Sequence, residues 1–219
     1  MKKQYAVLGL GVFGSTIATT LAKHGCEVLA VDRDVSCVER VAGEVTKAVV
    51  ANVTHKEELI QLGLPEFDVA VVAIGDHLED AVLATMALKE LGVPMVIAKA
   101  RNKEFLRILE KVGADRVIRA EKDMGIRVAK SLMRRKIKDI VELDDENSIV
   151  EIQTAQRWVG KAIADLNVRE KYQMNILGIR HNKNECLEIG VDPSYIIQEN
   201  DRFLVLARTD KLEQFDRSK

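Results

Sequence analysis

Residues 5–14 read YAVLGLGVFG, and this stretch decides the fold class. An apolar run, Tyr5–Leu8, is followed directly by three glycines with the spacing G-x-G-x-x-G, and Phe13–Lys23 then has the composition of a helix. A buried strand, a glycine turn and a helix in this order are typical of the first crossover of a doubly wound α/β domain. The stretch therefore predicts a parallel sheet that begins with Tyr5–Leu8.

The same alternation of short apolar runs and helical stretches continues to about residue 120. The runs are apolar throughout, which is typical of strands that helices cover on both faces. We expect further strands at Glu27–Val31, Ala48–Ala51, Val69–Ile74, Met95–Ala98 and Arg116–Ile118. We expect helices at Val35–Gly43, Lys56–Leu62, Leu78–Leu91 and Lys103–Val112. The sequence thus predicts a six-stranded, doubly wound parallel Rossmann sheet.

The pattern changes after Glu121. Asp123–Lys138 is predicted to be one long amphipathic helix with a basic C-terminal end, Arg134–Lys138, where cations suit the helix dipole. Short strands are then expected at Ser148–Gln153, Met174–Ile179, Cys186–Ile189 and Arg202–Leu206. This order indicates a small α+β C-terminal domain. We therefore divide the chain into residues 1–135 and 136–219.

Composition excludes several classes of protein. The chain has 219 residues, of which 33 are Lys or Arg and 34 are Asp or Glu, so it lacks the basic surplus of a sequence-independent nucleic-acid binder. Its apolar runs are shorter than the roughly 18–20 residues of a membrane span, and we expect a cytoplasmic protein. The three scattered cysteines, Cys26, Cys37 and Cys186, suggest neither a disulfide framework nor a zinc site.

The glycine turn is also the strongest candidate binding site. Gly9 permits a tight turn, Gly11 lets a phosphate approach the backbone, and Gly14 lets the helix pack closely on the strand. The helix N-terminus that follows attracts anions. Asp32, at the end of the second strand, is placed to accept hydrogen bonds from a ribose. The alternatives are a plain strand–helix turn and, for Asp32, a helix N-cap or a solvated loop acid.

Polar or small residues also follow the third, fourth and fifth strands. Ligands of doubly wound sheets lie outside the carboxyl ends of the strands, so these residues are candidates for the same site. Lys99 and Arg101 are candidates for binding phosphate, and Asn52 or Thr54 for the edge of a base. Ala73 and Gly75 complete the set. The alternative is that each polar residue simply belongs to a solvated loop.

Residues 113–125, GADRVIRAEKDMG, carry a more specific signal. Together with the glycine turn, Asp32, Asn52–Thr54 and Lys99, they resemble the Ktr/Trk family over nearly the whole chain. The members of this family are cytosolic regulatory subunits of bacterial potassium uptake systems. They consist of a nucleotide-binding RCK domain and a small RCK-C domain, and the resemblance implies both for this chain.

The resemblance implies a role for each candidate residue. The turn, including Val12 and Phe13, would hold the phosphates of ATP or ADP, or of NAD(H), and Asp32 the ribose. Asn52 and Thr54 would lie near the adenine and Lys99 near the terminal phosphates. Glu121 would face Mg²⁺ or Ca²⁺ at a dimer interface. Homodimers would assemble through the crossover helix into a ring, commonly an octamer, docked under a membrane potassium channel, and nucleotide exchange would gate K⁺ flow.

One position departs from the family pattern. Ktr proteins usually carry Arg between the second glycine and the aromatic residue, where it meets the γ-phosphate, but this chain has Val12. The departure leaves open whether ATP and ADP are discriminated. Lys99, Arg101 or an Arg of a neighbouring subunit would then replace it, or the ligand would be NAD(H) or AMP.

The C-terminal domain offers a second candidate site. Ile163–Arg169 resembles the RCK-C segment that binds cyclic di-AMP in some members, with Ile163, Val168, Arg169 and Ile176 as the matching contacts. Aliphatic side chains can sandwich a purine while an Arg pairs with a phosphate. The alternative is a helix end with core contacts and a solvated Arg169. Val191 occupies the place where a supporting proline is expected, and Pro193 follows two residues later.

The rival function is an NAD(H)-dependent oxidoreductase. Such an enzyme needs an acid or base near the nicotinamide. The sequence shows no Tyr-x-x-x-Lys pair, and we expect neither a His–Asp couple nor a reactive cysteine. We therefore expect a regulatory protein and no enzyme.

Overall fold

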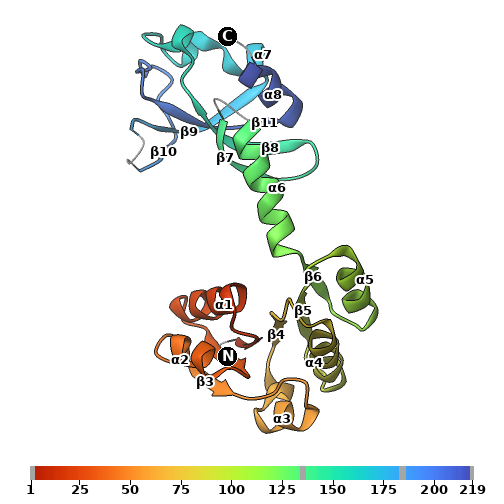
Figure 1. Ribbon diagram of the computed structural model, residues 1–219. Helices are drawn as coiled ribbons and strands as arrows, with labels where there is room; N and C mark the ends of the chain where they lie inside the picture. The colour runs from red at the N-terminus through yellow and green to blue at the C-terminus, as the bar shows by residue number, and fades with distance from the viewer. Residues whose placement is uncertain (1–2, 134–136, 183–185, 218–219) are drawn as a thin grey trace. The chain divides into compact units, whose positions relative to one another are not determined.

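A computed structural model describes residues 3–133, 137–182 and 186–217 (Figure 1). The chain forms two compact units, Met1–Met124 and Gly125–Lys219. The predicted boundary at residues 135–136 and the basic residues Arg134, Arg135 and Lys136 lie outside the described residues. Among the described residues, no helix is long and apolar enough to cross a membrane.

The first unit is a parallel sheet in the order β3-β2-β1-β4-β5-β6. Its strands are β1 (Gln4–Leu8), β2 (Glu27–Asp32), β3 (Lys47–Val50), β4 (Val69–Val72), β5 (Met95–Lys99) and β6 (Arg116–Ile118). Its helices are α1 (Val12–Lys23), α2 (Val35–Val41), α3 (Lys56–Gln61), α4 (Leu78–Glu90) and α5 (Lys103–Lys111). The doubly wound fold is confirmed. The strand order reverses between β1 and β4, which is where such sheets bind ligands.

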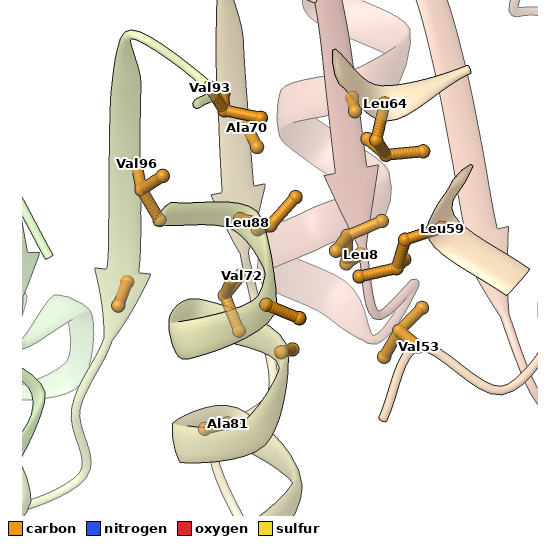
Figure 2. Packing of buried hydrophobic residues seen from close by; sticks show 14 of the residues in the cluster. Leu8, Val53, Leu59, Leu64, Ala70, Val72, Ala81, Leu88, Val93 and Val96 are labelled. Carbon is orange, nitrogen blue, oxygen red and sulfur yellow. The ribbon is translucent and has the colours of Figure 1, made fainter. Parts of the chain in front are cut away.

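Each face of this sheet has its own hydrophobic core, because successive strand residues point to opposite faces. Leu8 of β1 and Val72 of β4 pack with Leu59 of α3 and Leu88 of α4 on one face, as Figure 2 shows. Val7 of β1 joins the core on the other face, where buried residues of α1 and α2 pack. Burial on both faces explains why the strands read as continuous apolar runs.

The crossover region differs from the prediction. Helix α6 runs from Ala120 to Met133, so it begins before Asp123, and Lys138 belongs instead to strand β7 (Ile137–Glu142). The helical expectation for Lys138 was therefore wrong. Residues 137–142 contain three β-branched residues, Ile137, Ile140 and Val141, which favour a strand when a partner strand is present. That partner is β8 (Asn147–Gln153), which pairs antiparallel with β7.

The second unit is an antiparallel sheet in the order β10-β9-β11-β8-β7, and the small α+β domain is thus confirmed. Besides β7 and β8, its elements are β9 (Met174–Arg180), β10 (Glu188–Ile189), β11 (Arg202–Arg208), α7 (Val168–Tyr172) and α8 (Thr209–Arg217). Trp158, Phe203 and Phe215 pack together in its core. Helix α8, which the sequence analysis did not predict, supplies Leu212 and Phe215 to that core.

Candidate functional site

The turn between β1 and α1 requires glycine at two positions. Gly9 has a φ of +95°, in the left-handed region, and its N–H donates to the carbonyl oxygen of Val31 at 2.8 Å. A Cβ on Gly9 would lie 3.2 Å from the carbonyl carbon of Ala73. A Cβ on Gly14 would overlap the carbonyl oxygen of Gly9. These glycines therefore let β1, β4 and α1 come together.

Gly11 is different, because it faces open space. A Cβ there would meet no described atom within 4 Å, and its backbone is extended with a φ of −62°. Gly11 is the N-cap of α1, and no described side chain caps that helix end. The next residue, Val12, is 86% exposed. An uncapped helix N-terminus beside open space can receive a phosphate.

Asp32 fixes the turn from the end of β2. Its Oδ2 accepts a hydrogen bond from the N–H of Leu10 at 2.6 Å, and its Oδ1 accepts from the N–H of Asp34 at 2.9 Å. The helix N-cap is Asp34, whose Oδ1 accepts from the N–H of Ser36. Asp32 is therefore neither an N-cap nor a solvated loop acid. Each carboxylate oxygen keeps further acceptor capacity for a ligand.

A cavity of about 320 Å³ opens at the carboxyl ends of β1, β2, β3 and β4. Seven of the residues expected from the sequence line it: Gly9, Gly11, Asp32, Asn52, Thr54, Ala73 and Gly75. The other five, Val12, Phe13, Gly14, Lys99 and Arg101, are not among its lining residues. The structure thus brings the glycine turn, Asp32 and the Asn52–Thr54 loop together around one hollow.

The Asn52–Thr54 loop is held by its own hydrogen bonds. Asn52 Oδ1 accepts from the N–H of Thr54 at 3.1 Å and from its Oγ1 at 2.9 Å. The N–H of Asn52 donates to Glu58 Oε2 at 2.7 Å. Hydrogen bonds from His55 and from the N–H of Asn52 lower the pKa of Glu58. The loop is therefore preorganised, with part of its polar capacity already used.

Lys99 lies beside this cavity with a partner of its own. Its Nζ is 2.6 Å from Glu121 Oε1 and 5.7 Å from the ring centre of Phe13. A Cβ on Gly75 would lie 3.1 Å from Lys99 Nζ, so the lysine crosses over that glycine. The hydrogen bond from Lys99 lowers the pKa of Glu121. Lys99, Phe13, Gly75 and Glu121 thus form a second group of candidate residues.

Arg101 is not part of that group, since its guanidinium lies 5.4 Å from the ring centre of Phe105 on α5. A metal site is also incomplete. Among the described residues there is no cluster of three His, Cys, Asp or Glu side chains that could hold an ion. Glu121 could supply one carboxylate, and further ligands would have to come from a nucleotide, water or another subunit.

The sequence analysis missed several residues that line the cavity. They are Arg33, Asp34 and Cys37 after β2, and His77 and Asp80 after β4. Arg33 and Asp34 directly follow β2, so the strand-end rule could have found them. Asp80 lies in the first turn of α4, far from Arg33 in the sequence. The tertiary fold brings Asp80 Oδ2 to 3.3 Å from Arg33 Nη1.

The second unit contains a cavity of about 370 Å³ between α7, β9 and the preceding turn. All four expected residues, Ile163, Val168, Arg169 and Ile176, are among its lining residues. Segment 192–197 holds the part of the lining that contains Ile163 and Ala164. The N–H groups of these two residues donate to the carbonyl oxygens of Tyr195 and Pro193, respectively. Arg169 and the aliphatic side chains therefore share one hollow.

That supporting segment is anchored by a polar cluster that the sequence analysis did not expect. Tyr195 Oη donates to Asp201 Oδ2 at 3.0 Å, and His181 Nδ1 lies 3.2 Å from Asp201 Oδ1. The expectation that no His–Asp couple exists was therefore wrong. Burial and Asp201 raise the pKa of Tyr195 to about 12. The cluster lies in the second unit and does not line the cavity of the glycine turn.

Comparisons with known proteins agree with this architecture. Residues 5–120 match the family model of the TrkA-N domain, and residues 148–219 match the TrkA-C domain. The chain is 42% identical to the Ktr system potassium uptake protein A of Bacillus subtilis (strain 168), covering 98% of this chain and 96% of that protein. It is 36% identical to the Ktr system potassium uptake protein C of the same organism, covering 99% and 97%.

A similar fold is found among solved structures. The crystal structure of the GsuK RCK domain matches with a TM-score of 0.67 over 99% of this chain and 47% of that one. The sequences are 14% identical, so this likeness concerns the fold.

Proposed function

Because this chain belongs to the family of proteins built from TrkA-N and TrkA-C domains, we propose that it is the regulatory subunit of a potassium uptake system. It binds an adenine nucleotide and thereby controls K⁺ flow through a membrane partner. The observation that carries the proposal is the similarity to two Ktr system proteins over nearly their full length, combined with the cavity at the glycine turn.

The first unit supports a nucleotide at the reversal of strand order. In the proposed complex the adenosine occupies the cavity, with its ribose at Asp32 and its base near Asn52 and Thr54. The phosphates meet the N-terminus of α1 at Gly11, where backbone N–H groups and the helix dipole favour negative charge. Lys99 can turn from Glu121 toward the terminal phosphate, because an ammonium on a long side chain reorients easily.

The identity of the nucleotide follows from these contacts only in part. Val12 supplies no charge for a γ-phosphate, so ATP, ADP, AMP and NAD(H) all remain candidates. A divalent cation, Mg²⁺ or Ca²⁺, would bind at Glu121, where a carboxylate and nucleotide phosphates can supply oxygen ligands.

The second unit supports a further ligand. We assign cyclic di-AMP to the cavity of Ile163, Val168, Arg169 and Ile176, because Arg169 can pair with a phosphate while the aliphatic side chains contact a purine. The functional division of the chain is taken as residues 1–135 for the nucleotide domain and 136–219 for this second domain.

Regulation requires more than one conformation. We take the protein to be a cytoplasmic homodimer that assembles into a ring, an octamer in our proposal, docked on its membrane channel. The ligand shifts the ring between shapes only by its differential affinity for them.

An NAD(H)-dependent oxidoreductase is the alternative, and two observations speak against it. The relatives with the highest identities named above are potassium uptake proteins. The His181–Asp201 couple is held in the second unit by Tyr195, and neither residue of the couple lines the glycine-turn cavity.

One thermal-shift series with ATP, ADP, AMP, NADH and cyclic di-AMP tests the proposal. We expect at least one adenine nucleotide to raise the unfolding temperature of wild type. Asp32→Ala is expected to weaken the binding free energy of that nucleotide by about 1–3 kcal/mol. Arg169→Ala is expected to abolish binding of cyclic di-AMP and to spare the nucleotide. NADH oxidation with a panel of small substrates should stay flat. Indifference to every adenine compound, or steady turnover of NADH, contradicts the proposal.

A further inference from the structure

An ion pair links two elements that border the nucleotide cavity. Arg33 follows Asp32 at the end of β2, and Asp80 lies in the first turn of α4. Arg33 Nη1 is 3.3 Å from Asp80 Oδ2, and both residues line the cavity. The pair therefore connects the loop after β2, where the ribose would be held, with the helix after β4.

The charges around this cavity are unbalanced. Four carboxylates line it, those of Asp32, Asp34, Asp76 and Asp80. Arg33 is the one Lys or Arg among the described residues that line it. In the structure the guanidinium of Arg33 is paired with the carboxylate of Asp80.

The position of Arg33 matters because the residues next to the ribose carboxylate decide whether a 2′-phosphate is accepted. In doubly wound folds an acidic residue binds the ribose hydroxyls, whereas a nearby Arg accommodates a 2′-phosphate. This chain carries both, Asp32 and Arg33, next to each other. Whether Arg33 can accept a 2′-phosphate beside Asp32 depends on which group already pairs with its guanidinium.

We propose that Asp80 is a specificity-determining residue, which excludes 2′-phosphorylated adenosines by engaging Arg33. With Asp80 ionised, a 2′-phosphate would compete with a carboxylate for the guanidinium and would also face Asp32 and Asp34. Without that carboxylate, Arg33 can offer two parallel N–H donors to the 2′-phosphate. The inference rests on the proposed nucleotide site and names its ligand class more narrowly, as adenosines with an unmodified 2′-hydroxyl.

The test compares two ligands that differ only in the 2′-phosphate, AMP and adenosine 2′,5′-bisphosphate. Their affinities for the full-length protein are measured by calorimetry at one salt concentration, because phosphate contacts depend on ionic strength. Asp80→Asn removes the charge of Asp80 with little change in shape. The side chains of Arg33 and Asp80 are 64% and 27% exposed, and a partly exposed ion pair contributes little to stability, so this variant is expected to fold.

Glu79→Gln is the matched control. Glu79 is the exposed neighbour of Asp80 in the same turn of α4, and it does not line the cavity. We expect Asp80→Asn to increase the preference for the bisphosphate over AMP about tenfold, the gain typical of one charge-assisted hydrogen bond. Glu79→Gln should leave that preference unchanged. Adding Arg33→Ala to Asp80→Asn should remove the gain.

Each outcome bears on a different claim. If wild type binds AMP but Asp80→Asn leaves the preference unchanged, the specificity role is overturned while the nucleotide site stands. Equal gains in Asp80→Asn and Glu79→Gln, or a gain that survives Arg33→Ala, would mean a general charge effect and would also overturn it. If wild type binds no adenine nucleotide at all, the proposed function fails first and the inference fails with it.

Discussion

At the scale of single residues, the glycine turn contains both tightly packed and open positions. A Cβ on Gly14 would overlap the carbonyl oxygen of Gly9, whereas a Cβ on Gly11 would meet no described atom within 4 Å. The G-x-G-x-x-G spacing predicts the same division, with Gly14 for helix packing and Gly11 for the approach of a phosphate. Gly14 is therefore needed for packing, and we expect a ligand to approach the backbone at Gly11.

This difference predicts opposite effects for two alanine variants. Gly14→Ala should lower the free energy of unfolding by about 1–3 kcal/mol, because α1 has to move off β1. Gly11→Ala should leave that free energy nearly unchanged and weaken nucleotide binding about tenfold by crowding the phosphate. Chemical denaturation and calorimetry measure the two quantities. A stable Gly14→Ala protein would show that α1 adjusts without loss.

Val12 allows a gain-of-function test at the same helix end. Val12→Arg should increase the preference for ATP over ADP, because a guanidinium at the N-terminus of α1 can pair with a γ-phosphate. Val12→Leu, which adds bulk without charge, is the control. An ATP/ADP affinity ratio that is the same in wild type and Val12→Arg would show that position 12 does not sense the γ-phosphate.

At the scale of elements, the sequence predicted the first unit well and the crossover poorly. Apolar runs such as Tyr5–Leu8 are strands because helices bury both of their faces, and a sequence carries that signal locally. Residues Ile137–Glu142 combine charges with β-branched residues, and their strand state depends on pairing with β8. The Arg33–Asp80 pair could not be predicted from the sequence either, because it joins the loop after β2 to α4, and β2 and β4 lie on opposite sides of β1.

The polar cluster of His181, Tyr195 and Asp201, which anchors segment 192–197, leads us to predict a pH dependence of stability. Burial lowers the pKa of His181, but hydrogen bonds and charges from Asp201 and Glu188 outweigh it, so the pKa is raised. A raised folded pKa means that protonated His181 stabilises the fold fully below the unfolded value, about pH 6.5. This stabilisation is lost as the pH rises through the folded pKa.

We therefore expect the free energy of unfolding of the second unit to fall as the pH rises above about 6.5 in wild type, and to fall less in His181→Gln. Trp158 is the single tryptophan and lies in the core of that unit, so its fluorescence follows this unit alone. Urea titrations at several pH values give the comparison. Parallel pH profiles in both proteins would show that the imidazole contributes nothing.

At the scale of the whole molecule, the proposal requires assembly. Light scattering of the purified chain should give a mass that is a multiple of 24.4 kDa and, for an octamer, eightfold. Adding a nucleotide should change the hydrodynamic size or the extent of the assembly, because a ligand that binds one conformation more tightly shifts the equilibrium toward it. A protein that stays at the mass of one chain with and without nucleotide would contradict the ring.

The contact between Lys99 and Glu121 joins the candidate site to the start of α6. Glu121 lies in the first turn of that helix, and its carboxylate is neutralised by the ammonium 2.6 Å away. In the proposed complex, a phosphate that attracts Lys99 would take the counter-ion from Glu121 and leave an uncompensated carboxylate at the start of α6. Binding of an anion at the carboxyl edge of the sheet would thereby create a place for a cation on the same edge, which a metal ion or a positively charged neighbour could fill.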